Sequence, residues 1–401
     1  MTNSSVVLNT TSHREDSFIQ TQGPNGVKSI FPAHQSSSHS TMEVSSVISS
    51  TAVPSNILQS GGFVEWTLPK QKKKIHAIHL EVTLKNTTSG TVSLNRAFSL
   101  LDKIEYFSGS NFLGVSEQQA MYLKYALLNA DSQISARAQY TNLTSSWTSW
   151  GLELEAGGSR TLYIEMGEML SGLIPGFLNQ ELRLRVHFDK MMRSLTSTAA
   201  NSISITNSKL LVENVALEEP ELAEIESIYK SNKFTHRFFE PRVQKAPLTL
   251  TTGGSYTISL QNFYGSFSQL WVSIREAEED FLSTYNYLNF VDNIWLTDAG
   301  NKIALGGNIL KADFLRYQNG ANFPSSFLGR NAVIPLVSSK SSFVDLKSGR
   351  HSGSLQLSAK GEALHIQLRS DSPISGNHIV QIVGWHASAL RVQDGNIIVL
   401  R

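Results

Sequence analysis

Apolar and polar residues alternate along several short stretches of the chain, and turn residues separate these stretches. In the stretch from 181 to 188, ELRLRVHF, every second residue is apolar and the residues between them are charged or polar. A period of two is typical of a β-strand with one face in a core and the other in water. Similar runs predict strands at 63–68, 75–84, 161–166 and 202–215.

A second group of such runs follows residue 248 and continues to the end of the sequence. It comprises 248–263, 269–274, 293–298, 333–338, 352–358, 362–370, 377–387 and 396–401. Three other segments have apolar residues or good helix formers at helical spacing, which predicts helices at 117–133, 218–230 and 308–319. The segment 218–230 lies between the two groups of strands, so we expect it to connect them, together with 231–247.

Two regions of the sequence repeat one another. Residues 101–111 read LDKIEYFSGSN and residues 291–301 read VDNIWLTDAGN. Asp102 and Asp292 are 190 positions apart (292 less 102), and LKY at 123–125 and LRY at 315–317 are 192 apart (315 less 123). Because strand, turn and helix recur in one order at a nearly constant offset, we expect two similar units in tandem.

These patterns predict an all-β fold of two tandem eight-stranded jelly rolls, each with a short inserted helix. A length of 401 residues suits two domains better than one core. The predicted division is an N-terminal arm at 1–60, a first jelly roll at 61–217, a connecting helix and linker at 218–247, and a second jelly roll at 248–401.

The predicted arm differs from the rest of the chain in composition. In residues 35–50, nine of the sixteen residues are Ser or Thr. Such a segment cannot bury enough apolar surface to fold alone. Two interpretations stay open: an extended arm that becomes ordered against a partner, and a disordered tail.

Charge and cysteine content exclude several functions. There are 34 Lys and Arg residues against 33 Asp and Glu residues. A net charge of +1 produces no strong positive electrostatic potential that would attract nucleic acid. The chain has no cysteine, which excludes disulfides, thiol nucleophiles and thiolate metal sites. The N-terminal residues do not resemble a secretory signal, and no run approaches the roughly 20 apolar residues of a spanning helix. We therefore expect a protein that is not exported. Four Asn-x-Ser/Thr triplets, which have the form of glycosylation sites, are then expected to occur by chance, at Asn3, Asn9, Asn86 and Asn142.

No catalytic, cofactor-binding or metal-binding residue is predicted. His76 and His79 have the wrong spacing for a metal cage, because we expect them on opposite faces of a strand. The acidic run at 275–281 lacks the spacing of a calcium loop. The basic run at 70–74, KQKKK, is expected to be a solvated turn; facing a membrane, it would gain about 1 kcal/mol per charge from anionic head groups.

The sequence resembles the double jelly-roll major capsid proteins of tailless, membrane-containing bacteriophages of the tectivirus type, whose wider lineage includes the adenovirus hexon. The resemblance covers roughly residues 60–401. The segments that carry it are 95–130 and 171–189 in the first half, and 290–303 and 377–387 in the second.

This resemblance implies a major capsid protein of the virion with no enzymatic activity and no cofactor. It implies a homotrimer that forms a pseudo-hexagonal capsomer, with neighbouring capsomers closing an icosahedral shell over an internal membrane around the DNA genome. Minor capsid, vertex and membrane proteins would be further partners, and the N-terminal arm would lie toward the membrane. Synthesis and assembly in the host cytoplasm would follow. The arm departs from the family, in which it is often helical and rich in Gln and Ala.

A second interpretation comes from a different class of protein. A tandem β-sandwich could bind glycans through loop aromatics such as Trp147, Trp150 and Trp295, by stacking sugars on exposed rings. A glycan-cleaving enzyme of the two-jelly-roll kind is a third interpretation, which requires a cleft with paired carboxylates.

Overall fold

The computed structural model divides the chain into two compact units. Described residues from 16–238 and from 389–400 form the first unit, and described residues from 239–388 form the second. The described residues are 20–23, 26–29, 41–49, 52–94, 100–117, 120, 152–166, 169–188, 203–232, 234–276, 290–298, 301–302, 310–319, 331–336, 355–358, 361–371 and 376–400. We describe each unit by itself.

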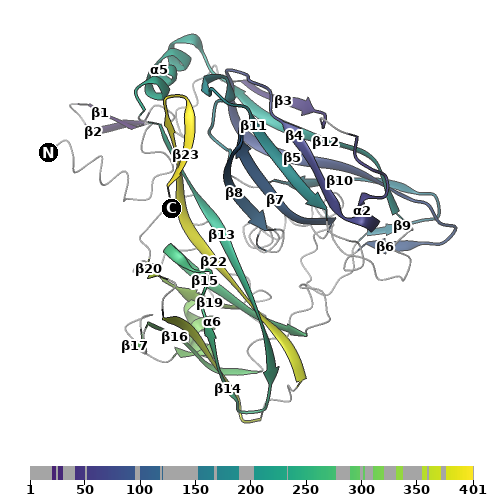
Figure 1. The fold of residues 1–401 in the computed structure, drawn as a ribbon, viewed down its shortest axis with the longest axis vertical. Coiled ribbons are helices and arrows are strands. Elements are labelled where there is room, and N and C mark those ends of the chain that lie inside the picture. Colours follow the sequence, from purple (N-terminus) through teal and green to yellow (C-terminus); the bar gives the residue numbers. More distant parts are fainter. Residues whose placement is uncertain are drawn as a thin grey trace. The chain divides into compact units, whose positions relative to one another are not determined.

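The first unit contains two four-stranded antiparallel sheets (Figure 1). In one sheet the strand order is β10-β5-β12-β3, and in the other it is β4-β11-β7-β8. A small sheet pairs β6 (Val92–Leu94) with β9 (Leu152–Leu154), and a hairpin pairs β1 (Gln20–Gly23) with β2 (Gly26–Ser29). The main strands are β3 (Thr41–Val47), β4 (Gly62–Thr67), β5 (Lys74–Asn86), β7 (Leu101–Ser108), β8 (Asn111–Glu117), β10 (Ser159–Glu165), β11 (Leu182–Phe188) and β12 (Ile203–Ala216).

The second unit repeats this plan. One sheet has the order β13-β22-β15-β19, with β20 also paired to β15, and the other has the order β14-β21-β16-β17, with β18 also paired to β16. Residues 389–400, which hold the end of β22 and all of β23, belong to the first unit. The strands are β13 (Thr235–Leu250), β14 (Ser255–Ser259), β15 (Tyr264–Glu276), β16 (Val291–Asp298), β17 (Asn301–Lys302), β18 (Leu310–Lys311), β19 (Asn331–Pro335), β20 (Leu355–Ser358), β21 (Glu362–Leu368), β22 (Gly376–Gln393) and β23 (Asn396–Leu400).

Taken in chain order, eight strands of each unit pair in the same pattern. The first, last, third and sixth strands form one sheet, and the second, seventh, fourth and fifth form the other. This is the pairing of a jelly roll, so the predicted pair of tandem jelly rolls is confirmed. The offset of 190 recurs in the strand starts: 264 less 74 for β15 and β5, 291 less 101 for β16 and β7, and 301 less 111 for β17 and β8.

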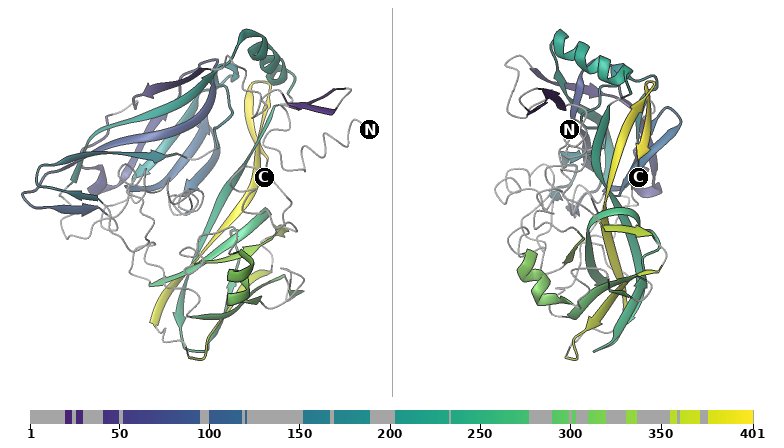
Figure 2. Two further views of the ribbon diagram at one scale, coloured as in Figure 1. Left: turned by 180° about the vertical axis from the view of Figure 1, so that it is seen from behind. Right: turned by 90° about the vertical axis from the view of Figure 1, so that its left-hand side faces the viewer.

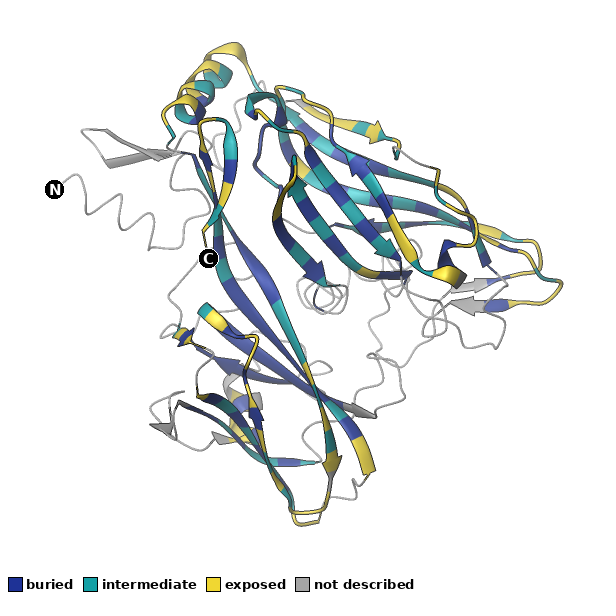
Figure 3. Ribbon diagram, in the orientation of Figure 1, coloured by how far each residue is buried: buried dark blue, intermediate teal, exposed yellow. Residues whose placement is uncertain are grey.

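The alternation that predicts the strands is also what buries one face of each. Along β11 the residues alternate between buried and half-buried without a break, and Figure 3 shows the same alternation in β4 and β7. Opposite this sheet, β5 contributes a buried row of Leu80, Val82 and Leu84. Burial of apolar surface at about 25 cal/mol per Å² is the main force that holds such faces together.

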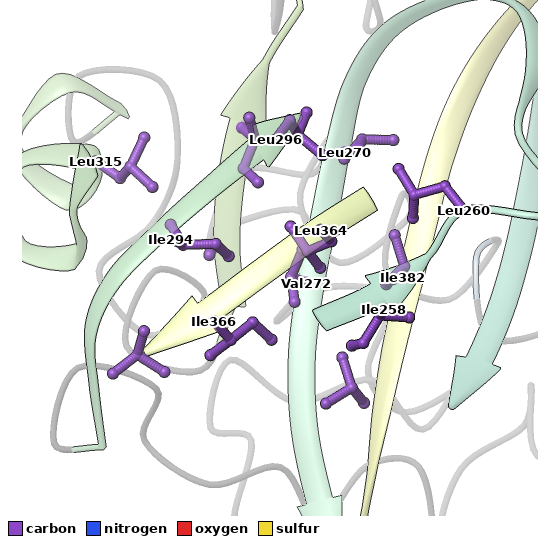
Figure 4. Close-up of a cluster of buried hydrophobic side chains, with 14 of the residues drawn as sticks. Ile258, Leu260, Leu270, Val272, Ile294, Leu296, Leu315, Leu364, Ile366 and Ile382 are labelled. Atoms are coloured by element: carbon purple, nitrogen blue, oxygen red, sulfur yellow. The ribbon is translucent and has the colours of Figure 1, made fainter. Parts of the chain in front are cut away.

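The core of the second unit is built in the same way from the inner faces of its two sheets. Figure 4 shows Val272 on β15 among Leu296 on β16, Leu364 and Ile366 on β21, and Ile382 on β22. Leu315 reaches this core from the helix α6 (Ala312–Asn319). Both units therefore have an apolar interior of their own.

Two of the three predicted helices are described. The helix α5 (Glu219–Lys230) matches the prediction for 218–230, with Glu219 and Glu221 in its first turn and Lys230 in its last, as the helix dipole favours. α6 begins at Ala312, later than predicted, because Leu310 and Lys311 pair with β16 as β18. The predicted helix at 117–133 falls almost entirely outside the described residues. Two short elements, α2 (Ile57–Ser60) and the 3-10 helix Pro175–Phe177, were not predicted.

The predicted domain limits stay an expectation, but two stretches within them have a different structure. The linker predicted at 231–247 forms most of β13, whose two prolines, Pro241 and Pro247, obscure the strand in the sequence. Proline is accepted at a sheet edge, which is where β13 lies. The arm predicted at 1–60 contains β3, which pairs with β12 through residues 41–47. Backbone pairing to an existing sheet orders this segment in spite of its Ser-rich composition.

The C-terminal hairpin of β22 and β23 is held to the first unit through its turn. Asn179 donates backbone and side-chain hydrogen bonds to the carbonyl oxygens of Gly395 (2.8 Å) and Asp394 (2.6 Å). The backbone N–H of Asp394 also donates to Oδ1 of Asn232, just after α5 (2.6 Å), and Figure 2 shows α5 beside this hairpin from two directions. The last strand of the chain thus lies in the first compact unit, although it pairs with β22 of the sheet β13-β22-β15-β19.

Candidate interaction surfaces

His76 and His79 do not lie on opposite faces of the strand, one toward the core, as the alternation predicts. Ile75 and Ile78 are both buried, three residues apart, because the pairing of β5 with β12 shifts by one residue between Ala77 and Ile75. This bulge leaves both histidines outside the core: His76 is exposed, and His79 Nε2 lies 3.1 Å from Oε1 of Glu213. In the described residues no group of three or more His, Asp or Glu side chains is placed to hold a metal ion.

Residues 70–73 of the basic run lie in the turn between β4 and β5, as expected, and Lys74 begins β5; the run also contacts other parts of the first unit. Lys70 Nζ donates to the backbone oxygen of Asn179 (2.7 Å). Lys72 lies 3.6 Å from a carboxylate oxygen of Glu226, and Lys73 pairs with Glu43. Contact with a membrane would have to compete with these interactions.

Asn86 is the one asparagine of the four Asn-x-Ser/Thr triplets that is described. Its side chain is fully buried, and Nδ2 donates to the carbonyl oxygens of Gly90 (2.7 Å), Leu154 (2.9 Å) and Glu155 (3.0 Å). The amide therefore organises the end of β5 and is closed to modification. Asn3, Asn9 and Asn142 lie outside the described residues, as do Trp147, Trp150 and residues 277–281 of the acidic run. Within the described part of the chain, no helix has the length and apolar composition needed to cross a bilayer.

The outward face of the sheet β4-β11-β7-β8 carries a connected set of charges, which we call the charged face. Glu65 on β4 accepts from Arg183 Nη1 (2.6 Å) and Arg185 Nη2 (3.2 Å), both on β11. Glu105 on β7 is bound by Lys103 Nζ (2.6 Å) and by His187 Nε2 (2.9 Å), and Arg185 Nη1 lies 3.7 Å from it. The charged face consists of Glu65, Lys103, Glu105, Arg183, Arg185 and His187.

Aromatic rings cover part of the charged face. The guanidinium of Arg185 lies 4.6 Å from the ring centre of Phe63 and 4.9 Å from that of Phe107, and Phe112 packs edge-on against Phe107. Phe63 and Phe112 are themselves about half exposed. Arginine stacked on aromatic rings is typical of protein interfaces, because it offers apolar contact and charge together.

Glu105 is a partly buried carboxylate of the charged face with a lowered pKa. Partial burial favours its neutral form, but hydrogen bonds and charge from Lys103 and His187 outweigh this and lower the pKa of Glu105 below 4.5. The carboxylate therefore stays charged at neutral pH and keeps β7 tied to β11.

The corresponding face of the second jelly roll, on the sheet β14-β21-β16-β17, has a different chemistry. Trp295 on β16 stacks on His365 on β21, with ring centres 5.0 Å apart and an angle of 4° between the planes. The two nitrogens of His365 are hydrogen-bonded to the hydroxyls of Thr257 (3.0 Å) and Thr297 (2.8 Å). Partial burial lowers the pKa of His365 below 6.5. We call this set the tryptophan-histidine cluster.

Trp295 is the only described residue of the three predicted glycan-stacking tryptophans. It is half-buried within a strand, with one ring face against His365, and does not stand on an exposed loop. Thr297 follows Trp295 by two residues on β16, but His365 and Thr257 could not be found from the sequence, because they come from β21 and β14, far from Trp295 in the chain.

A buried polar group lies within the second unit. Glu240 on β13 accepts from Arg242 Nη2 (3.2 Å) and from the hydroxyl of Ser388 (3.4 Å), and that hydroxyl is 2.7 Å from Nδ1 of His386. Glu240, His386 and Ser388 are all buried. A substrate would not reach this group, so it links β13 to β22 as a structural element.

No protein-family model matches the chain, and no curated protein matches it. Solved structures do. VP54 of PBCV-1 matches with a TM-score of 0.65 at 12% identity, over 93% of this chain and 99% of that one. The Faustovirus major capsid protein matches with a TM-score of 0.63 at 9% identity, over 90% and 92% of the two chains. The mavirus major capsid protein matches with a TM-score of 0.52 at 9% identity, over 89% and 90%.

The chain has the fold of double jelly-roll capsid proteins. The double jelly-roll fold of the predicted resemblance is therefore confirmed, while its tectivirus and hexon lineage stays a prediction. Because each match spans about nine-tenths or more of this chain, the similarity includes both jelly rolls.

Proposed function

We propose that the protein is a major capsid protein that acts structurally and has no enzymatic activity. The observation that carries this proposal is the similarity over nearly the whole length of both chains to proteins that are described as viral capsid proteins. A shared single jelly roll would say little, since that fold serves many functions. Two jelly rolls in tandem, with the same strand order and almost no additional chain, form a far more restricted architecture.

We further propose that three copies form a capsomer with a pseudo-hexagonal outline. Two similar units per chain give six similar units in a trimer, and repeated contacts between nearly equivalent units can build a closed shell. The net charge of +1 supports this proposal, because identical copies with little net charge do not repel one another strongly.

The remaining parts of the proposal concern partners and location. Neighbouring capsomers would close an icosahedral shell of a virion over an internal membrane around DNA, after assembly in the host cytoplasm. Minor capsid, vertex and membrane proteins would bind this shell, and residues N-terminal to β3 would face the membrane. The ion pairs of Lys72 and Lys73 argue for the N-terminal residues over the basic run as the membrane contact.

Light scattering coupled to size exclusion tests the proposal on purified protein. We expect a stable trimer over a hundredfold range of concentration, because capsomers are assembled before the shell. A monomer at every concentration would contradict it. Nothing at Trp295 favours the glycan-binding alternative, and incubation with a glycan array tests it. Specific glycan binding by a monomer would contradict our proposal.

A further inference from the structure

The strand β3 lies at an open edge of the first jelly roll. It pairs with β12 on one side, and no described strand pairs with its other side. The backbone N–H and C=O groups along such an edge can form a ladder with another strand. The edge is therefore a potential docking site, and the side chains decide what would dock there.

The outward side of β3 is apolar and unusually exposed. Met42 is 58% exposed, Val44 is 63% exposed, and Ile48, just beyond the strand, is 80% exposed. These residues alternate with Ser45 and Val47, which are half-buried, and the Ser45 hydroxyl accepts a hydrogen bond from Asn214 Nδ2 on β12 (3.1 Å). An exposed apolar row at an open edge favours association with another chain.

The equivalent edge strand of the second jelly roll is protected in a way that β3 is not. β13 occupies the same place in its sheet and contains Pro241 and Pro247 together with the charged residues Arg242 and Lys245. Prolines and charges are the features that prevent a strand edge from pairing. β3 has no proline, and its single charged residue, Glu43, is paired with Lys73 of the same chain.

We propose that β3 pairs edge to edge with β3 of a second copy of this chain, antiparallel about a two-fold axis at Val44. This register avoids a contact between like charges and brings apolar side chains together. It places Glu43 opposite Ser45 of the second copy, whereas a register centred on Glu43 would bring two carboxylates together. It also places the two Val44 side chains opposite each other, with Met42 of each copy diagonal to Val44 of the other, so that four apolar side chains cover one another.

This contact rests on the proposed function and adds to it. A two-fold contact uses the same surface on both copies and cannot by itself make a trimer, whose contacts follow a three-fold axis. Pairing through β3 is therefore a contact between capsomers. It would cover an apolar edge that is exposed in the single chain.

Disulfide formation tests the pairing directly, because the natural chain has no cysteine. In the proposed register the Val44 Cα atoms of two copies lie about 4.5–5.5 Å apart, within the range of a disulfide. We expect Val44→Cys to form a disulfide-linked dimer on mild oxidation. Ser46→Cys is the matched control on the same face of the same strand. Its two Cα atoms would be offset by four residues, about 14 Å at 3.4 Å per residue, too far to link.

The expected result is at least a tenfold larger fraction of linked dimer for Val44→Cys than for Ser46→Cys. Phe314→Cys, on the exposed side of α6, measures linkage by random collision. Equal linkage at all three positions, or none at Val44, would overturn the pairing.

A second test uses assembly. Val44→Lys should leave the thermal unfolding of the chain unchanged but reduce the amount of particles larger than a capsomer about tenfold. Unchanged assembly would also overturn the proposed pairing of β3.

The two proposals fail in different ways in this experiment. A trimer without a linkage at Val44 overturns the β3 contact and leaves the proposed capsomer standing. A linkage at Val44 in protein that never forms a trimer supports the contact and overturns the proposed capsomer.

Discussion

The charged face and the tryptophan-histidine cluster occupy the same place in two units with the same strand order. In the first jelly roll, the middle strand β11 presents Arg183, Arg185 and His187 to two glutamates. In the second, the equivalent strand β21 presents His365 to threonine hydroxyls and Trp295. The two units therefore share their strand pairing, while the outward side chains of β11 are held by ion pairs and His365 on β21 is held by hydroxyls and a ring.

The difference shows which residues the fold depends on. Inward positions of both units remain apolar and buried, such as Leu184 on β11 and Leu364 on β21. Outward positions carry no such requirement, because a half-buried sheet face tolerates many side chains that fit the pleat. In a trimer the two faces would meet different neighbours, so divergence of the outward faces is what we expect of a capsomer whose six units are similar but not identical.

The largest expected effect is the loss of inner-face packing, which should be equal in the two units. Leu184→Ala and Leu364→Ala each remove a fully buried side chain and should lower the free energy of unfolding by about 2–5 kcal/mol. Chemical denaturation followed by circular dichroism measures both. A loss below about 1 kcal/mol in one variant would contradict the equivalence of the two cores.

A smaller effect should distinguish the outward faces by their response to salt. Glu65→Gln removes the carboxylate that holds Arg183 and Arg185, and should cost about 1 kcal/mol at low ionic strength and less in high salt. In the second unit, Gln367→Ala removes the neutral hydrogen bond from Asn293 (2.7 Å) and should cost about 0.5–1.5 kcal/mol. Unfolding at two salt concentrations separates them, and a salt-dependent loss in Gln367→Ala would be inconsistent with this account.

The smallest expected effect is a difference in pH dependence. The lowered pKa of His365 means that the unfolded chain binds its proton more readily, so the second unit loses stability as the pH falls below 6.5 toward the folded pKa. Glu105 also has a lowered pKa, but its contribution is present above 4.5 and is lost only as the pH falls through the lower folded value.

His365→Gln should remove the change in stability that begins near pH 6.5, and Glu105→Gln should reduce the one that begins near pH 4.5. Thermal unfolding across this pH range measures both. The assignment is wrong if the two substitutions alter the same pH window.

The sequence predicted much of the fold because its information is local. Alternation along β11 identifies the strand and its buried face, and early acidic residues with a late lysine identify α5. The prediction failed where neighbours in space decide the structure. Pro241 suggests a linker until β13 is seen at a sheet edge, and one bulged residue in β5 leaves both His76 and His79 outside the core, where opposite faces were expected.

The candidate surfaces were harder to predict than the strands. Glu65 and Arg183 are 118 positions apart in the sequence, and Thr257 and His365 are 108 apart, so only the strand order brings them together. Met42 and Val44 lie in a Ser-rich segment that composition alone assigns to an arm, and the pairing of β3 with β12 reveals them as an exposed apolar row.

Electron cryo-microscopy of the purified protein tests the central claim most directly. Our account predicts a particle of three chains in which six β-sandwiches, two from each chain, surround a three-fold axis with a pseudo-hexagonal outline. A particle with only two β-sandwiches, or an oligomer without three-fold symmetry, would contradict the proposal that this chain builds a capsid.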